Sequence, residues 1–185
     1  MKYPYLFEKG YIGNVELKNR IVMAPMGIPG LTGYKGHFSD RAIDYYERRA
    51  MGETGLIITG VCLVNSKIEP WEIDGVQHLV TFDSIWKVRN FIQLTERVHD
   101  YGTKIFAQLT AGFGRVFPGR LVDRAMEEGV QPVAPSPIPL FWRPNIMARE
   151  LTTEEVDELV ESFGKAALIA KESQFDGIEL HGHEG

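Results

Sequence analysis

Two histidines and a glutamate close the chain at a spacing that could do chemistry. The run Ile178-Glu-Leu-His181 lies between turn residues on both sides, which indicates a short buried strand. Side chains alternate along a strand, so Glu179, His181 and His183 are expected on one face. Two imidazoles would then meet at the carboxyl end of a strand, where parallel α/β folds hold their active sites.

A pair of histidines one residue apart has three interpretations. Same-face imidazoles can share one Zn²⁺, but zinc needs further ligands, and the other histidines, His37, His78 and His99, fall in predicted loops or helices. A purely structural pair would bury two imidazoles and a glutamate without partners, which costs free energy. Imidazole groups can also hold an anion or a carbonyl oxygen. The sequence leaves all three open and favours the third.

The composition indicates one folded domain with a small-molecule partner. The chain has 185 residues, of which 44% are hydrophobic, enough for one core of ordinary size. The net charge of −5 provides no basic field for nucleic acid or an anionic membrane. No uncharged stretch could span a bilayer and the N-terminus has no apolar signal core, so we expect a cytoplasmic protein. The single cysteine, Cys62, lies in an apolar run and should pack as a small hydrophobe.

Strands and helices alternate along the chain. A hairpin is predicted over residues 11–19, because Gly13-Asn14 can supply the positive φ angles of a tight turn. Apolar runs predict strands covered on both faces at residues 20–26, 56–61, 104–109 and 178–181. Helices with apolar stripes are predicted between them, and their N-caps are Ser39, Asp83 and Thr152. This alternation predicts a parallel sheet with right-handed crossovers.

Repeated βα units fit either an open doubly wound sheet or half of an eight-stranded barrel. The chain stops directly after a strand with no covering helix, which indicates a truncated chain. Such a half barrel would expose the edge of its last strand, so self-association into a homo-oligomer is expected. Residues 111–150 interrupt the alternation of strands and helices, and they contain six prolines. A connection of this length is expected to be an active-site cover or a small subdomain.

The other strand ends carry residues that suit a flat ligand. The first strand ends in Ala24, Pro25 and Met26, the second at Gly60 and the third at Gln108. Small residues let a flat ring approach the backbone, and an amide offers both a donor and an acceptor to its edge. Gly60 and Met26 also have a packing explanation, and Gln108 can be read as a satisfied polar residue of the core. Phosphate-loop, Rossmann and G-x-S-x-G motifs do not occur, so nucleotide-binding sites of those types and a serine hydrolase are unsupported.

Motifs spread along the whole chain resemble the old yellow enzyme family. They are Phe7, Leu17-Lys-Asn-Arg-Ile-Val-Met-Ala-Pro-Met26, Gly55-Leu-Ile-Ile-Thr-Gly60, Ala107-Gln-Leu-Thr-Ala-Gly-Phe-Gly-Arg115, Ala134-Pro-Ser-Pro137 and Phe175-Asp-Gly-Ile-Glu-Leu-His181. The most similar branch is that of the bacterial NADH:flavin oxidoreductases, which includes 2-enoate reductase, 2,4-dienoyl-CoA reductase and bile-acid dehydroxylation enzymes. The resemblance implies that residues 1–185 form the N-terminal half of an FMN-binding TIM (β/α)8 barrel.

The resemblance also implies which residues hold the cofactor. Ala24, Pro25 and Met26 would line the flavin of FMN. Gly60 would give the flavin ring room, and Gln108 would hydrogen-bond its pyrimidine edge. NAD(P)H would reduce the flavin, and in larger members a [4Fe-4S] cluster and FAD are bound by parts of the protein beyond this chain.

The implied reaction is the reduction of an electron-poor C=C bond, of enoate or enoyl-thioester type, by hydride from flavin N5. His181 and His183 would bind the carbonyl or carboxylate oxygen on which negative charge grows. The family spaces this pair His-x-x-His or His-x-x-Asn, whereas this chain has His181-Gly-His183, and the tyrosine proton donor would follow residue 185. Residues 1–185 alone are expected to bind FMN poorly and to lack turnover. A metal-dependent hydrolase with the histidine pair as ligands, and an inactive fragment that binds a partner, are the alternatives.

Overall fold

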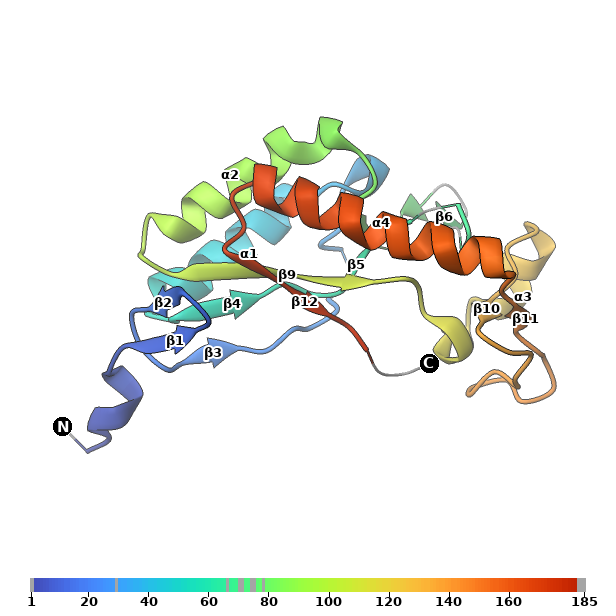
Figure 1. The fold of residues 1–185 in the computed structure, drawn as a ribbon, viewed down its shortest axis with the longest axis horizontal. Helices are drawn as coiled ribbons and strands as arrows, with labels where there is room; N and C mark the ends of the chain where they lie inside the picture. Colours follow the sequence, from blue (N-terminus) through green and yellow to red (C-terminus); the bar gives the residue numbers. More distant parts are fainter. Residues whose placement is uncertain are drawn as a thin grey trace.

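A computed structural model describes residues 2–28, 30–65, 67–69, 72–73, 76–77 and 79–182. Its centre is a parallel sheet whose main strands lie side by side in chain order. They are β3 (Val22–Met23), β4 (Leu56–Ile58), β9 (Lys104–Thr110) and β12 (Gly177–Leu180). The long helices lie on one side of this sheet (Figure 1). Parallel strands in chain order with helices on one side form half of a β/α barrel.

The second predicted strand breaks in its middle. It was expected over residues 56–61, but Thr59 makes the last ladder hydrogen bond, and Gly60 instead donates its N–H to the Tyr46 hydroxyl at 2.9 Å. The chain resumes as β5 (Cys62–Leu63), which pairs with the end of β9 and with β8 (Val80–Thr81). The strand therefore breaks at Gly60, where the backbone N–H bonds to Tyr46 of the preceding helix instead of to a neighbouring strand.

The helices begin and end close to their predicted limits. They are α1 (Asp40–Met51), α2 (Val88–His99) and α4 (Thr153–Glu172). The predicted cap at Ser39 is confirmed, since its side chain accepts the N–H of Ala42. The predicted capping box is confirmed as well, because Thr152 and Glu155 exchange side-chain to backbone hydrogen bonds.

One predicted cap is wrong. Asp83 was expected to cap the helix before β9, but Ser84 accepts the N–H of Trp86 in a 3-10 turn, η3 (Ile85–Lys87), that precedes α2. Asp83 instead lies 2.6 Å from the ammonium group of Lys87, whose side chain is 9% exposed. A buried cation needs a counter-charge, and this requirement determines where the carboxylate lies.

The two faces of the sheet have different surroundings. Alternate residues of β9, among them Ile105 and Leu109, pack against the helices in the main core. Phe106 belongs to a smaller cluster on the opposite face, together with Leu17 and Leu56. Leu17 ends the predicted hairpin, which is confirmed as β1 (Gly10–Ile12) and β2 (Val15–Leu17). The side of the sheet that carries Phe106 is called the interior face below.

Residues 111–150 form a layer with its own apolar core, built largely from this segment. Their elements are η4 (Gly114–Val116), α3 (Val122–Glu127), β10 (Val133–Ala134) and β11 (Arg149–Glu150). The completely buried carboxylate of Glu69 accepts the backbone N–H groups of Phe113, at 2.7 Å, and Val133, at 3.2 Å. Glu69 belongs to the loop after β5, which also contains a small hairpin of β6 (Glu72–Ile73) and β7 (Val76–Gln77). Its hydrogen bonds therefore connect this loop to the layer of residues 111–150.

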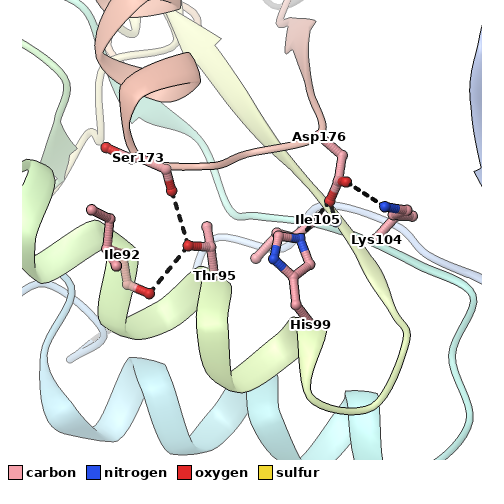
Figure 2. Close-up of polar contacts among 7 residues, drawn as sticks. All are labelled: Ile92, Thr95, His99, Lys104, Ile105, Ser173 and Asp176. Carbon is pink, nitrogen blue, oxygen red and sulfur yellow. Dashed lines mark hydrogen bonds and ion pairs between the residues drawn. The ribbon is translucent and has the colours of Figure 1, made fainter.

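Asp176 joins α2 to the start of β9 and β12 (Figure 2). Its carboxylate lies 2.7 Å from His99 Nε2 and 2.8 Å from Lys104 Nζ, and it accepts the N–H of Ile105 at 2.9 Å. Burial alone raises the pKa of this carboxyl, but the hydrogen bonds from His99, Lys104 and Ile105 outweigh it and hold the pKa below its usual range. The ionised carboxylate therefore stabilises the folded chain.

Replacing Asp176 with asparagine is expected to lower the free energy of unfolding by about 2 kcal/mol at pH 7, because hydrogen bonds to a charged group are lost. A lowered pKa stabilises the fold above the unfolded value of about 3.9 and loses that effect as pH falls through the folded value. The gap between wild type and Asp176→Asn should therefore narrow below about pH 4. Urea denaturation at several pH values measures it, with the exposed Asp157→Asn as control. A gap that stays constant down to pH 3 would contradict this account.

Candidate active site

The carboxyl ends of β3, β4, β9 and β12 meet along one edge of the half barrel, because parallel neighbours end on the same side. The predicted site residues at or just beyond these ends are Ala24, Pro25, Met26, Gly60, Gln108 and His181. The second predicted catalytic histidine, His183, lies outside the described residues.

The residues after β3 lie outside the hydrogen-bond ladder. The apolar run was predicted over residues 20–26, with Pro25 expected to end its ladder pairing because it has no N–H to donate, and the strand ends at Met23, two residues before Pro25. Ala24 and Met26 are exposed at this edge. Met26 contacts the neighbouring strand end so closely that a Cβ atom on Gly60 would lie 2.4 Å from its carbonyl oxygen. Close backbone approach thus explains the glycine without any ligand.

Gln108 and Glu179 form a pair on the interior face. The register places them opposite each other on β9 and β12, and Gln108 Nε2 donates to Glu179 Oε1 at 2.7 Å. Gln108 is 6% exposed, and its backbone N–H donates to the Thr59 hydroxyl. Its side-chain oxygen has no hydrogen-bond partner among the residues that the structure describes. The sequence put Glu179 on the face of His181 but predicted no partner, since pairing across strands depends on register.

His181 continues β12 by one hydrogen bond, from its N–H to the carbonyl oxygen of Leu109 at 2.9 Å. Alternation along the strand puts it on the same face as Glu179, and the residue is half-buried. The imidazole is thus at the carboxyl end of its strand, as predicted. Across the part of the chain that is described, no three His, Cys, Asp or Glu residues gather as a metal site.

A cavity of about 270 Å³ opens beside this edge. Met26 and Gly60 line it together with Tyr46, Phe113 and Arg120. Sequence reasoning missed the last two, because they come from the irregular segment 111–150, where no periodic pattern shows which side chains point inward. Burial raises the pKa of Tyr46, so its hydroxyl stays protonated beside the cavity.

Cys62 lies beneath the same edge, and its thiol has low reactivity. It is completely buried, as predicted, and burial raises the pKa of its thiol to about 12. Its sulfur lies near the Thr59 hydroxyl and the carbonyl oxygen of Gly60. A protonated, enclosed thiol is a poor nucleophile. None of the described helices is both long enough and apolar enough to cross a membrane.

Residues 5–185 match the model of the NADH:flavin oxidoreductase / NADH oxidase family. The chain belongs to this family. A curated relative, the cinnamate reductase of Clostridium sporogenes, is 45% identical over 185 residues, which are 100% of this chain and 27% of that protein. The NADH oxidase of Thermoanaerobacter brockii is 42% identical over 183 residues, 99% of this chain and 26% of that one. The chain thus spans about a quarter of each relative's length.

Solved structures share the fold. The old yellow enzyme homologue from Zymomonas mobilis is 31% identical, with a TM-score of 0.74 over 96% of this chain and 48% of that one. Morphinone reductase is 25% identical, with a TM-score of 0.74 over 95% of this chain and 47% of that one. These likenesses confirm the predicted resemblance to old yellow enzymes and the predicted fold class, half of a TIM barrel.

Proposed function

We propose that this chain supplies most of the flavin contacts and the substrate-binding histidines of an FMN-dependent, NAD(P)H-oxidising ene-reductase. The observation that carries the proposal is the gathering of Gly60, Gln108 and His181 at one edge of a half barrel that belongs to a flavin oxidoreductase family. Cinnamate, named in the curated relative from Clostridium sporogenes, is an enoate. We therefore propose enoates or enoyl thioesters as the substrate class.

The side chains at this edge suit a flavin. The pyrimidine edge of a flavin alternates hydrogen-bond acceptors with one N–H donor, and the side-chain oxygen of Gln108, which has no partner within the described ranges, can accept from such a donor. Ala24 carries only a methyl group, so a flat ring can approach the backbone there, and Gly60 lets the residues after β3 pack closely against the end of β4. Pro25 and Met26 would complete that wall. When bound, the flavin supplies hydride, taken from NAD(P)H, to the β-carbon of the alkene.

His181 would hold the oxygen of the substrate. Negative charge grows on the carbonyl or carboxylate oxygen as the conjugated C=C bond accepts hydride, and an imidazole N–H placed there stabilises that charge. His183 is proposed as the second donor. A proton at the α-carbon then completes the saturated product, so the overall change consumes one NAD(P)H and one proton for each alkene.

Residues 111–150 are proposed as a cover for the site. Phe113 and Arg120 from this segment line the cavity beside Gly60. The buried carboxylate of Glu69 holds the segment through backbone N–H groups at Phe113 and Val133. A cover of this kind excludes water, which strengthens the hydrogen bonds that act on the substrate.

The complete gene product provides the test. Purified protein is expected to be yellow with one FMN per chain, and to oxidise NAD(P)H anaerobically only when an enoate such as cinnamate is present. Residues 1–185 expressed alone are expected to bind FMN poorly and to show no turnover, whereas a yellow stoichiometric complex of that chain would contradict the second expectation. A complete protein that contains bound zinc and no flavin would instead support a metal-dependent hydrolase.

A further inference from the structure

We infer that Glu179 is a positioning residue, which turns the carboxamide of Gln108 so that its oxygen faces the flavin. This inference rests on the proposed function, since it assigns Gln108 to the pyrimidine edge. It adds a role for a carboxylate that need not itself touch the cofactor or the substrate.

The geometry of the pair is specific. Gln108 and Glu179 are register partners on adjacent parallel strands, and both point to the interior face. The distance of 2.7 Å between Gln108 Nε2 and Glu179 Oε1 is at the short end for an N–H···O bond, as expected when the acceptor is ionised. Glu179 on one side and the Thr59 hydroxyl on the other flank Gln108, which is 6% exposed, so its side chain has little freedom to rotate elsewhere.

The chemistry of the two groups determines which end of the amide faces Glu179. An ionised carboxylate only accepts hydrogen bonds, whereas a carboxamide has a donating NH2 end and an accepting oxygen end. Rotating the amide by 180° would place two acceptor oxygens against each other and leave the carboxylate without this partner. The pair is therefore satisfied in one orientation only, with the oxygen of Gln108 turned away from Glu179.

That orientation provides what a flavin edge needs. The oxygen of Gln108 has no partner among the described residues, so it can accept the N–H of the pyrimidine ring. A hydrogen bond from Nε2 to a carboxylate also draws electron density toward the amide oxygen and strengthens it as an acceptor. The negative charge of Glu179 near the ring opposes the gain of electrons, so it lowers the reduction potential of the flavin.

The variant Glu179→Gln keeps the shape and removes the charge. An amide pair can be satisfied in either orientation, so the preference for the oxygen is lost. In the complete gene product we expect FMN to bind about 5- to 10-fold more weakly, which corresponds to roughly 1 kcal/mol. We also expect the flavin reduction potential to become more positive and the melting temperature to stay close to that of the wild type. Glu161→Gln on α4, whose side chain is 72% exposed, is the matched control and should change none of these values.

The outcomes separate this inference from the proposed function. Unchanged FMN affinity and potential in Glu179→Gln would overturn it, and so would a loss of affinity that only parallels a loss of thermal stability. Wild-type protein that binds no FMN would overturn the proposed function and the flavin part of the inference. In the flavin-free protein, the side-chain NH2 resonances of Gln108 should show one hydrogen-bonded proton that Glu179→Ala abolishes; two protons at the chemical shifts of a solvent-exposed glutamine amide in the wild type would overturn the pairing itself.

Discussion

Replacing His181 with alanine is expected to lower kcat/KM for the alkene about 100- to 1,000-fold while FMN stays bound, because a donor to the developing oxyanion is lost. The residue is half-buried at the end of β12 and does not belong to an apolar core, so its removal should leave the fold intact. Steady-state kinetics with NAD(P)H and an enoate measure the effect. The visible absorption spectrum reports the FMN content of the same preparation.

A second histidine provides the control for this prediction. His37 is half-buried in the loop before α1 and does not line the cavity, so His37→Ala should keep kcat/KM within about threefold of the wild type. Flavin reduction by NAD(P)H in His181→Ala, followed by stopped flow, should be slowed less than alkene reduction. If His181→Ala turned over the alkene at the wild-type rate, the imidazole would not hold the substrate oxygen.

Replacing Gly60 with alanine is expected to cost about 2–3 kcal/mol of folding free energy and to weaken FMN binding at least tenfold. A Cβ atom at this position would lie 2.4 Å from the carbonyl oxygen of Met26, and backbone atoms cannot rotate away as a flexible side chain can. The residues that follow β3 must therefore move, and they carry Ala24 and Met26 at the proposed flavin wall. Thermal denaturation and FMN titration of the complete gene product measure the two effects.

The matched control for Gly60→Ala is another glycine to alanine change. Gly164 lies within α4, and a Cβ atom there would meet nothing within 4 Å. Gly164→Ala should raise the free energy of unfolding by up to about 1 kcal/mol, because alanine favours a helix more than glycine does. If Gly60→Ala and the wild type had the same free energy of unfolding, the loop after β3 would be able to move away from the added Cβ atom without loss of stability.

Features that depend on neighbouring residues in the chain were predictable from the sequence. The capping box of Thr152 and Glu155 and the hairpin turn at Gly13 involve residues a few positions apart, so their geometry is local. The alternation of apolar runs with helical stripes predicted the parallel sheet, because each pattern has its own period. The alternation left an open sheet and a half barrel both possible, and the shared motifs, which predicted the family, decided between them.

Contacts between distant residues were not predictable. Gly60 leaves its strand for the hydroxyl of Tyr46, fourteen residues earlier. Asp83 pairs with Lys87 only four residues later instead of capping a helix, but the burial of that lysine depends on the surrounding fold. The arrangement of residues 111–150 also depends on the buried carboxylate of Glu69, for which no spacing signal exists. In each case a buried polar group had to find a partner, and that requirement overrode the local pattern.

The apolar stripe predicted for α4 also separates what the local sequence predicts from what the tertiary structure decides. Its positions follow helical spacing, yet Val156 is 40% exposed and Val160 is 67% exposed, because no described element covers them. The sequence by itself determined which face of each helix and strand is apolar, the family, and the residues at the strand ends. Only the tertiary structure decided that Gln108 faces Glu179 and that Gly60 abuts Met26. Periodicity depends on one segment alone, whereas register and close approach depend on two segments together.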